Sequence, residues 1–187
     1  MQTTARVDTS LARLIEERSG QPVNTCYQCR KCTAGCPTAY AMDFDPAQIV
    51  RMVQLGQSDE LMRSTAIWLC VGCETCGTRC PNQICIGKIN DSLKAMMVET
   101  GAPAGEKSIY QFHRAFLNSI RRFGRTHEVT MLAEYALHAP AVLADMGLGI
   151  QMFLAGKLPI IPRLIKRRRQ VSELFPQPVI EPHETSE

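Results

Sequence analysis

Eight cysteines in this sequence stand in two groups with the same internal spacing. The first group reads Cys26-x2-Cys29-x2-Cys32-x3-Cys36-Pro37, and the second, 44 residues further on, reads Cys70-x2-Cys73-x2-Cys76-x3-Cys80-Pro81. Thiolates are soft metal ligands, and this run is typical of loops that hold 4Fe-4S clusters. Three cysteines at two-residue intervals can wrap around three corners of such a cube. The fourth, fixed by the proline that follows it, points away toward a second cube.

The doubled motif therefore predicts two 4Fe-4S clusters that exchange their fourth ligands. One cluster is expected on Cys26, Cys29, Cys32 and Cys80, and the other on Cys70, Cys73, Cys76 and Cys36. Zinc is disfavoured because zinc sites favour paired cysteine knuckles. Disulfides are disfavoured because the sequence shows no export signal and we expect a cytoplasmic location, where thiols stay reduced.

Several neighbours of the motifs have two possible roles. The ninth cysteine, Cys85, is expected to be a buried small side chain between two isoleucines, and a ligand role is the minor alternative. Trp68, just before the second motif, is expected in the core. The motif glycines are expected to let the backbone approach the clusters and donate amide hydrogen bonds; these are Gly35, Gly72 and Gly77. Basic residues beside the motifs either raise the reduction potentials or form a solvated surface; these are Arg30, Lys31 and Arg79.

The composition disfavours several other functions. The chain has 187 residues, a formal net charge of +3 and 6% aromatic residues, so a nucleic-acid surface is not expected. No glycine-rich nucleotide motif, histidine metal motif or uninterrupted apolar run of membrane-spanning length occurs in the sequence. We expect a non-catalytic protein without a transmembrane helix.

Helical patterns predict the elements that position the cysteines. Helices are expected over 8–18, 46–55, 59–69, 86–100, 107–122 and 126–138. Asp45 is expected to cap the second of these, with Pro46 at its first position. The expected fold is all-α, an α-helical ferredoxin domain with two cluster-binding loops over residues 1–102. A helical extension over 103–174 and a disordered tail over 175–187 are expected to follow.

The extension carries two candidate docking features. Apolar residues at helical spacing either bind partner subunits or complete the core; these are Phe112, Phe116, Ile120, Phe123, Phe153, Leu154, Leu158, Ile160 and Ile161. A short cationic run is either a solvated helix end or a surface for an acidic partner or anionic lipid, so peripheral membrane contact is possible; it consists of Arg163, Lys166, Arg167, Arg168 and Arg169.

Three segments resemble HdrC, the smaller iron–sulfur component of heterodisulfide reductase. These are IWLCVGCETCGTRCPNQI at 67–84, FHRAFLNSIRRFGRTHE at 112–128 and MFLAGKLPIIPRLIK at 152–166. The resemblance extends from about Leu11 to Lys166. Cysteine motifs of this kind are shared by many proteins, so the two later segments supply the specificity. Cys85 and the Pro/Glu-rich tail depart from the family pattern without touching the ligand set.

The resemblance implies an α-helical ferredoxin that relays electrons within a complex. The donor would be an HdrA-like flavoprotein, and the acceptor an HdrB-like protein that reduces a disulfide. An iron–sulfur subunit of a membrane-associated quinone- or fumarate-linked oxidoreductase is an alternative, although the sequence lacks the plant-type C-x4-C-x2-C motif. A structural metal-binding interaction module is an alternative of another class.

Overall fold

The chain is helical in the computed structural model, which describes residues 9–101, 104–138, 146–157, 162 and 164–175. No strand occurs within these ranges. The all-α fold class expected from the sequence is therefore confirmed. The helices fall into two units that divide between Glu106 and Lys107, and each unit is described by itself.

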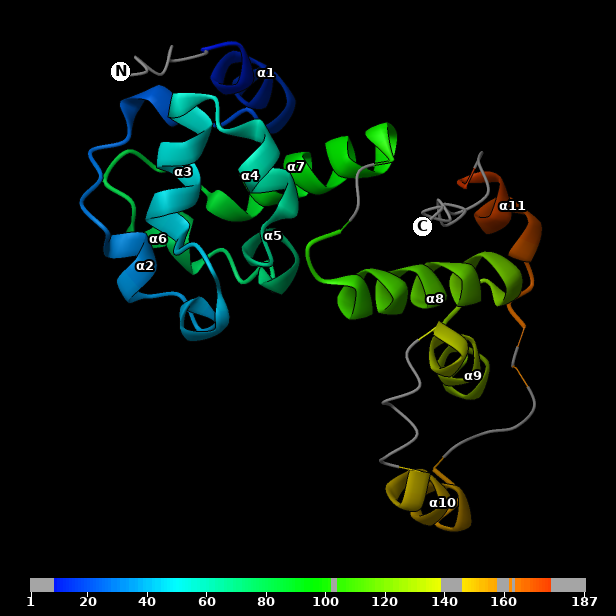
Figure 1. Ribbon diagram of the computed structural model, residues 1–187. Helices are drawn as coiled ribbons and strands as arrows, with labels where there is room; N and C mark the ends of the chain where they lie inside the picture. The colour runs from blue at the N-terminus through cyan, green and yellow to red at the C-terminus, as the bar shows by residue number, and fades with distance from the viewer. Residues whose placement is uncertain (1–8, 102–103, 139–145, 158–161, 163, 176–187) are drawn as a thin grey trace, which may run out of the picture. The chain divides into compact units, whose positions relative to one another are not determined.

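The first unit carries both cysteine motifs among short helices (Figure 1). In chain order these are α1 (Ser10–Ser19), η1 (Val23–Thr25), α2 (Lys31–Ala34), η2 (Ala39–Ala41), α3 (Pro46–Leu55), α4 (Ser58–Arg63), α5 (Ala66–Leu69), α6 (Thr75–Arg79) and α7 (Ile86–Thr100). The second unit contains α8 (Lys107–Phe123), α9 (Glu128–His138), α10 (Met146–Leu154) and α11 (Arg168–Glu173). Helices α2 and α6 each begin one residue before the third cysteine of a motif.

Helix α3 begins and ends where the sequence predicts. The Asp45 carboxylate accepts hydrogen bonds from the backbone N–H groups of Ala47 at 2.9 Å and Gln48 at 3.1 Å. The Gln48 side chain in turn accepts the Asp45 N–H at 2.8 Å, which completes a capping box. Gly56 ends the helix with φ of 72°, a left-handed conformation that favours glycine.

The helix expected over 59–69 is wrong, because two helices occupy this stretch. Helix α4 ends at Arg63 and α5 begins at Ala66, with Ser64 in an extended conformation between them. The carboxylate of Asp43 accepts hydrogen bonds here from the Ser64 hydroxyl, the Thr65 N–H and the Ala66 N–H at 2.8 to 2.9 Å. These bonds satisfy the first amides of α5 from outside the helix, so the chain breaks where no local residue signals an end.

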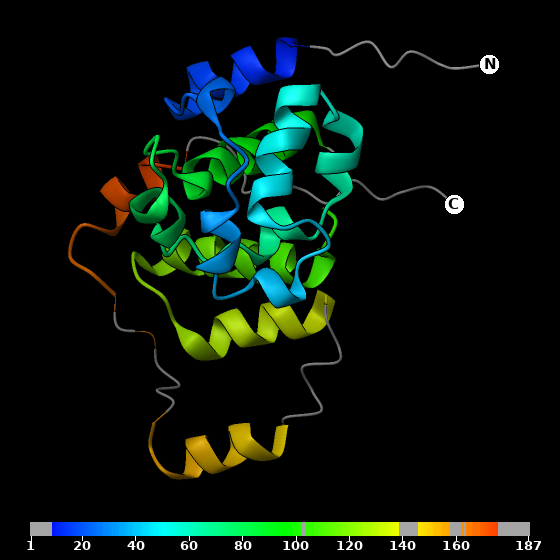
Figure 2. The same cartoon turned by 90° about the vertical axis from the view of Figure 1, so that its left-hand side faces the viewer.

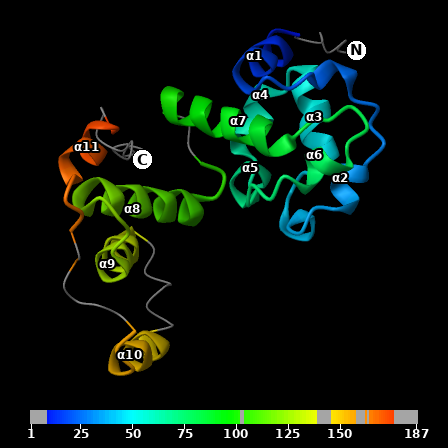
Figure 3. The same cartoon turned by 180° about the vertical axis from the view of Figure 1, so that it is seen from behind.

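The core of the first unit is an apolar cluster shared by α1, α3 and α7. Helix α1 packs against α3 (Figure 2), and α7 packs against α1 and α5 (Figure 3). Trp68 on α5 is buried, with 5% of its surface exposed, as the sequence predicted. The largest fully buried apolar side chains are Ile15, Ile49, Leu61, Ile67, Ile84, Ile89, Leu93 and Met97. This core holds the ends of both cysteine loops in fixed positions.

The second unit is built on α8, which packs against α9 and α11. The buried Ser119 hydroxyl accepts the His127 N–H at 2.8 Å, and the His127 ring contacts the Thr130 hydroxyl at 2.6 Å, so His127 orders the start of α9. Among the described residues, no helix is both long and apolar enough to cross a membrane. The predicted tail beyond Phe175 and the apolar residues Leu158, Ile160 and Ile161 lie outside the described ranges.

Candidate iron–sulfur sites

The backbone of the two cysteine loops repeats along with their sequence. In the first loop Gln28 and Arg30 have φ of 54° and 60°, and in the second Gly72 and Glu74 have φ of 64° and 57°. Each pair therefore flanks the second cysteine of its motif with two left-handed residues. For residues other than glycine this conformation costs about 1–2 kcal/mol each, so the surrounding structure must impose it. The loops are consequently folded around that cysteine rather than extended past it.

The first predicted ligand set lines one cavity of the first unit. Its lining residues are Cys26, Tyr27, Gln28, Cys29, Arg30, Lys31, Cys32, Ala47, Cys80, Pro81 and Asn82. The Asn82 side-chain amide donates a hydrogen bond to the Thr25 carbonyl, which ties the segment after Cys80 to the start of the first motif. This bond explains how a cysteine from the second motif reaches the first cavity.

Electrostatic surroundings differ among the cysteines of the first cavity. Burial raises the pKa of the Cys32 thiol, although hydrogen bonding to Thr33 opposes the shift. The Cys26 sulfur accepts hydrogen bonds from the backbone and side-chain amides of Gln28 at 3.5 and 3.4 Å. Arg30 and Lys31 give this wall two cationic side chains. A negatively charged iron–thiolate cluster suits such donors and positive charges.

The second predicted ligand set lines a separate cavity. Its lining residues are Cys36, Pro37, Thr38, Met42, Pro46, Cys70, Val71, Cys73, Glu74, Cys76, Ile86, Gly87 and Asn90. Burial raises the pKa of the Cys76 thiol, while hydrogen bonds from the Gly87 and Ile86 backbone oppose that shift. These two amides belong to the first turn of α7, where free N–H groups favour negative charge. A hydrogen bond from the Thr75 side chain lowers the pKa of the exposed Cys73 thiol.

The packing of α2 against α6 brings the two fourth cysteines across. Gly35 and Arg79 occupy equivalent places in the repeat, immediately before Cys36 and Cys80. The Arg79 side chain lies over Gly35 so closely that a Cβ built on Gly35 would be 2.5 Å from the Arg79 Cδ. One member of the pair must therefore be small where the other is large. This contact gives Gly35 a role that the cysteine motif does not predict.

The other two motif glycines also have distinct roles. Gly72 has a left-handed conformation with open space around it, so its backbone shape requires glycine. A Cβ on Gly77 would lie 3.1 Å from the Cβ of Cys85, which is buried with 7% of its surface exposed. Cys85 thus packs against the second loop as a small core side chain, in the way the sequence indicated, and its N–H donates to the buried Gln21 side chain at 2.7 Å.

The donor sets fit 4Fe-4S clusters. Each cavity is lined by four thiols, three from one motif and one from the other. No group of three His, Cys, Asp or Glu side chains in the described part of the chain is arranged to hold a single metal ion. In the second cavity the fully buried Asn90 has an amide oxygen without a hydrogen-bond partner, so the cavity is built with a polar group in its wall. The assignment of each thiol to a cluster remains a prediction.

The sequence gives no sign of the residue that joins the first loop to the core. Asp45 not only caps α3 but also accepts the Thr33 hydroxyl at 2.8 Å and forms an ion pair with Arg30. Burial raises the pKa of the Asp45 carboxyl, but the hydrogen bonds from Thr33 and Gln48 and the positive charge of Arg30 outweigh burial and lower it. The capping pattern marked Asp45 as a helix start, whereas its partners 12 and 15 residues away carry no local signal.

Comparisons with known proteins match the cysteine region. Residues 22–84 match the 4Fe-4S dicluster domain family. The chain is 39% identical over 82 residues to the iron–sulfur HdrC component of the CoB–CoM heterodisulfide reductase of Methanopyrus kandleri, covering 44% of this chain and 41% of that protein. It is 32% identical over 88 residues to the HdrC component of the H2:CoB-CoM heterodisulfide,ferredoxin reductase of Methanothermobacter thermautotrophicus, covering 47% and 46%.

A third relative extends the match slightly. The chain is 32% identical over 102 residues to an iron–sulfur HdrC component of the CoB–CoM heterodisulfide reductase of Methanocaldococcus jannaschii, covering 54% of this chain and 51% of that protein. The chain thus spans about half the length of the curated relatives it matches, or somewhat less. Residues 22–84 are a 4Fe-4S dicluster domain, and the chain that contains them is a homologue of HdrC from heterodisulfide reductase.

Proposed function

We propose that this chain is the electron-transfer subunit of a heterodisulfide-reductase-type complex. The observation that carries the proposal is the sorting of eight cysteines into two cavities, each lined by three cysteines of one motif and the fourth of the other. That exchange is the arrangement expected of a two-cluster ferredoxin. The similarity to iron–sulfur HdrC proteins supports the same function.

In this proposal the eight thiols hold two 4Fe-4S clusters. Cys26, Cys29, Cys32 and Cys80 bind one, and Cys70, Cys73, Cys76 and Cys36 bind the other. When bound, each cluster supplies a site that accepts and releases one electron. The protein contributes the thiolates, hydrogen bonds to them, and partial burial of all but the second cysteine of each motif. Cys29 and Cys73 are exposed, so each site has an edge that a partner protein can approach.

The proposed partners are an HdrA-like flavoprotein as electron donor and an HdrB-like disulfide reductase as acceptor, in the cytoplasm. The C-terminal extension is the proposed docking element. Its helix α8 keeps Phe112 and Phe116 37% and 38% exposed, although aromatic side chains are normally buried when no partner covers them. Leu137 on α9 and Leu154 on α10 are 82% and 78% exposed.

The test is to purify the chain under argon, count iron and sulfide, and record EPR spectra during stepwise reduction. The expected result is about eight iron and eight sulfide per chain, with two interacting signals that appear reversibly. Two zinc ions without iron would contradict the proposal. Iron that never changes its redox state would instead favour a structural module.

The partners need a separate measurement. The reduced chain should be reoxidised by the HdrB-like protein and re-reduced by the flavoprotein, each followed by the visible absorbance of the clusters. Intact clusters that exchange electrons with neither protein would contradict the relay while leaving the cluster assignment in place.

A further inference from the structure

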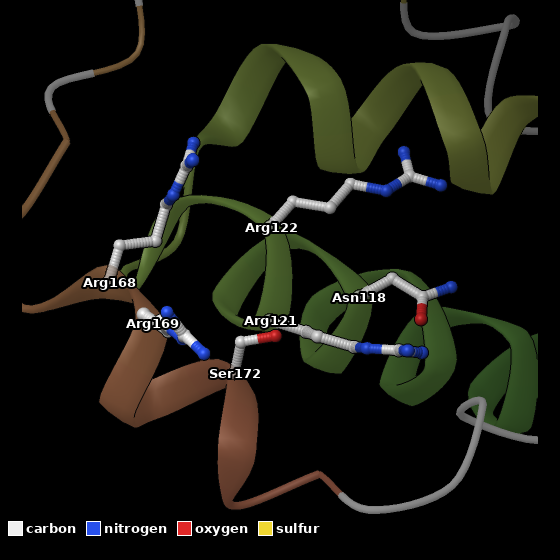
Figure 4. Close-up of a pocket in the computed structure, with 6 residues that line it drawn as sticks. All are labelled: Asn118, Arg121, Arg122, Arg168, Arg169 and Ser172. Atoms are coloured by element: carbon white, nitrogen blue, oxygen red, sulfur yellow. The ribbon is translucent and has the colours of Figure 1, made fainter.

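The second unit contains an open cavity with an unusual concentration of arginine. It lies between α8 and α11, has a volume of about 610 Å³, and is drawn in Figure 4. Its lining residues are Asn118, Arg121, Arg122, Arg168, Arg169 and Ser172. Two of the arginines belong to the cationic run noted in the sequence, and the other two come from the end of a helix more than 40 residues earlier. Folding therefore gathers two separate basic segments around one cavity.

Acidic side chains neutralise only half of this charge in the described part of the chain. Arg122 forms an ion pair with Glu134 at 3.4 Å, and Arg169 forms one with Glu173 at 3.2 Å. Asn118 also donates to Glu134, so this carboxylate holds part of the cavity wall in place. No ion pair is formed by Arg121, which is half-buried, or by Arg168 within the described ranges.

Two guanidinium groups without acidic partners repel each other unless an anion lies between them. Each presents N–H donors in a planar fork that matches phosphate or carboxylate oxygens. The packing of α11 on α8 keeps them in the same cavity despite that repulsion. A bound anion would remove the repulsion and stabilise this packing.

The lining also indicates what kind of anion fits. All six lining side chains are polar, and none is aliphatic or aromatic. The cavity thus offers no apolar contact to a nucleoside base, an acyl chain or the side chains of a peptide. A compact group with several charged oxygens can instead use the arginine forks and the Ser172 hydroxyl together.

We propose that this cavity binds a compact phosphate-bearing anion between Arg121 and Arg168. The phosphate can come from a free oligophosphate or from the head group of an anionic phospholipid, because the chemistry recognised is the same. The site is separate from the cysteine loops, so its occupancy is independent of the proposed electron transfer.

The first test measures binding of pyrophosphate to the full-length, cluster-loaded chain by isothermal titration calorimetry under argon at constant ionic strength. The expected result is saturable one-to-one binding that weakens at least tenfold in the double variant R121Q/R168Q. The double variant R13Q/R51Q removes two charges from exposed positions on α1 and α3 and should bind like the wild type. Absence of saturable binding to the wild type, or equal weakening in both double variants, would overturn the proposal.

A second variant separates the site from a folding defect. R121K/R168K keeps both charges but loses the planar forks, so it should retain the wild-type circular dichroism spectrum and bind more weakly than the wild type. Binding as tight as that of the wild type would contradict recognition by the two guanidinium groups.

Vesicle sedimentation distinguishes the two phosphate sources. Wild-type chain that sediments with vesicles containing phosphatidic acid, but not with phosphatidylcholine alone, and that pyrophosphate displaces, identifies a lipid head group. Binding of pyrophosphate without sedimentation identifies a free oligophosphate. If a polyglutamate peptide binds through Arg121 and Arg168 while pyrophosphate does not, the cavity receives an acidic protein segment and the phosphate proposal is wrong.

Discussion

At the scale of single residues, the two motifs differ in their neighbours even though their cysteines and backbone repeat. The first cavity has Arg30 and Lys31 in its wall, whereas the equivalent positions in the second motif are Glu74 and Thr75. Positive charge near a cluster favours its reduced form. The two predicted clusters are therefore in unlike electrostatic surroundings, which would separate their reduction potentials.

The exchange of fourth ligands can be tested with four single variants. If the clusters exchange ligands, C36A should alter the same EPR signal as C73A, and C80A the same signal as C29A, because each pair then belongs to one cluster. The other signal should remain as in the wild type in each case.

The control for this experiment is C85A, which removes a thiol outside both lining sets and should leave both signals intact. Matching effects of C36A and C29A would show instead that each motif binds its own cluster with all four cysteines.

At the scale of elements, the contact between α2 and α6 is the point where the repeat meets itself. A Cβ at Gly35 would collide with the Arg79 side chain, so the size of one residue constrains the other. Asp43 and Asp45 play a comparable part for the helices, since each carboxylate joins an element to a segment distant in sequence. These tertiary contacts decide how the cysteine loops are held.

The Gly35–Arg79 contact predicts a coupled pair of variants. G35A should destabilise the protein by about 1 kcal/mol, because the long Arg79 side chain can move aside only at the expense of its packing. In an R79A background the same change should be neutral or slightly stabilising.

Urea unfolding of cluster-loaded protein, followed by circular dichroism, measures both effects. G147A is the control, since a Cβ there meets no atom within 4 Å. Equal losses from G35A in both backgrounds would show that Arg79 is not the cause.

Asp43 allows a prediction of pH dependence. Burial raises the pKa of its carboxyl, but the hydrogen bonds from Thr65, Ser64 and Ala66 outweigh this and lower it. Because the folded-state pKa is depressed, the contribution to stability is complete above the unfolded value of about 3.9 and is lost only as the pH falls through the folded-state pKa.

D43A should therefore cost about 1 kcal/mol, a modest value because the carboxylate is exposed to solvent. The loss should be the same at pH 7 and pH 5 in urea unfolding experiments. D91A, which removes an exposed carboxylate on α7 that lies 3.8 Å from Lys94, is the matched control and should have little effect. A loss that shrinks between pH 7 and pH 5 would contradict a lowered pKa.

At the scale of the whole molecule, the chain consists of a cysteine-rich unit with its own core and a second unit that leaves apolar and cationic surface exposed. The first unit contains every cysteine. Cluster binding and partner binding can therefore be separated by truncation.

A chain ending at Glu106 should keep its full iron content and both EPR signals, because the second unit supplies no cysteine. It should no longer co-purify with the proposed partner proteins. Retained co-purification would show that the partners bind the first unit, and loss of iron would show that the units are not independent.

The cysteine spacing by itself determined the kind of cofactor, the number of sites and the predicted exchange of ligands, because 4Fe-4S ligation depends on a few residues at short fixed intervals. Local capping signals also determined helices such as α3 and α7, since Asp45, Pro46, Gly56 and Gly101 act within one turn of the chain. These are short-range effects that a sequence records directly.

Only the tertiary structure decided the features that depend on residues far apart in the chain. The break between α4 and α5 comes from a carboxylate about 20 residues away. The need for glycine at position 35 comes from Arg79, and the arginine cavity joins segments more than 40 residues apart. Such contacts leave no periodic or local pattern, because side chains from different elements meet only after the helices have packed.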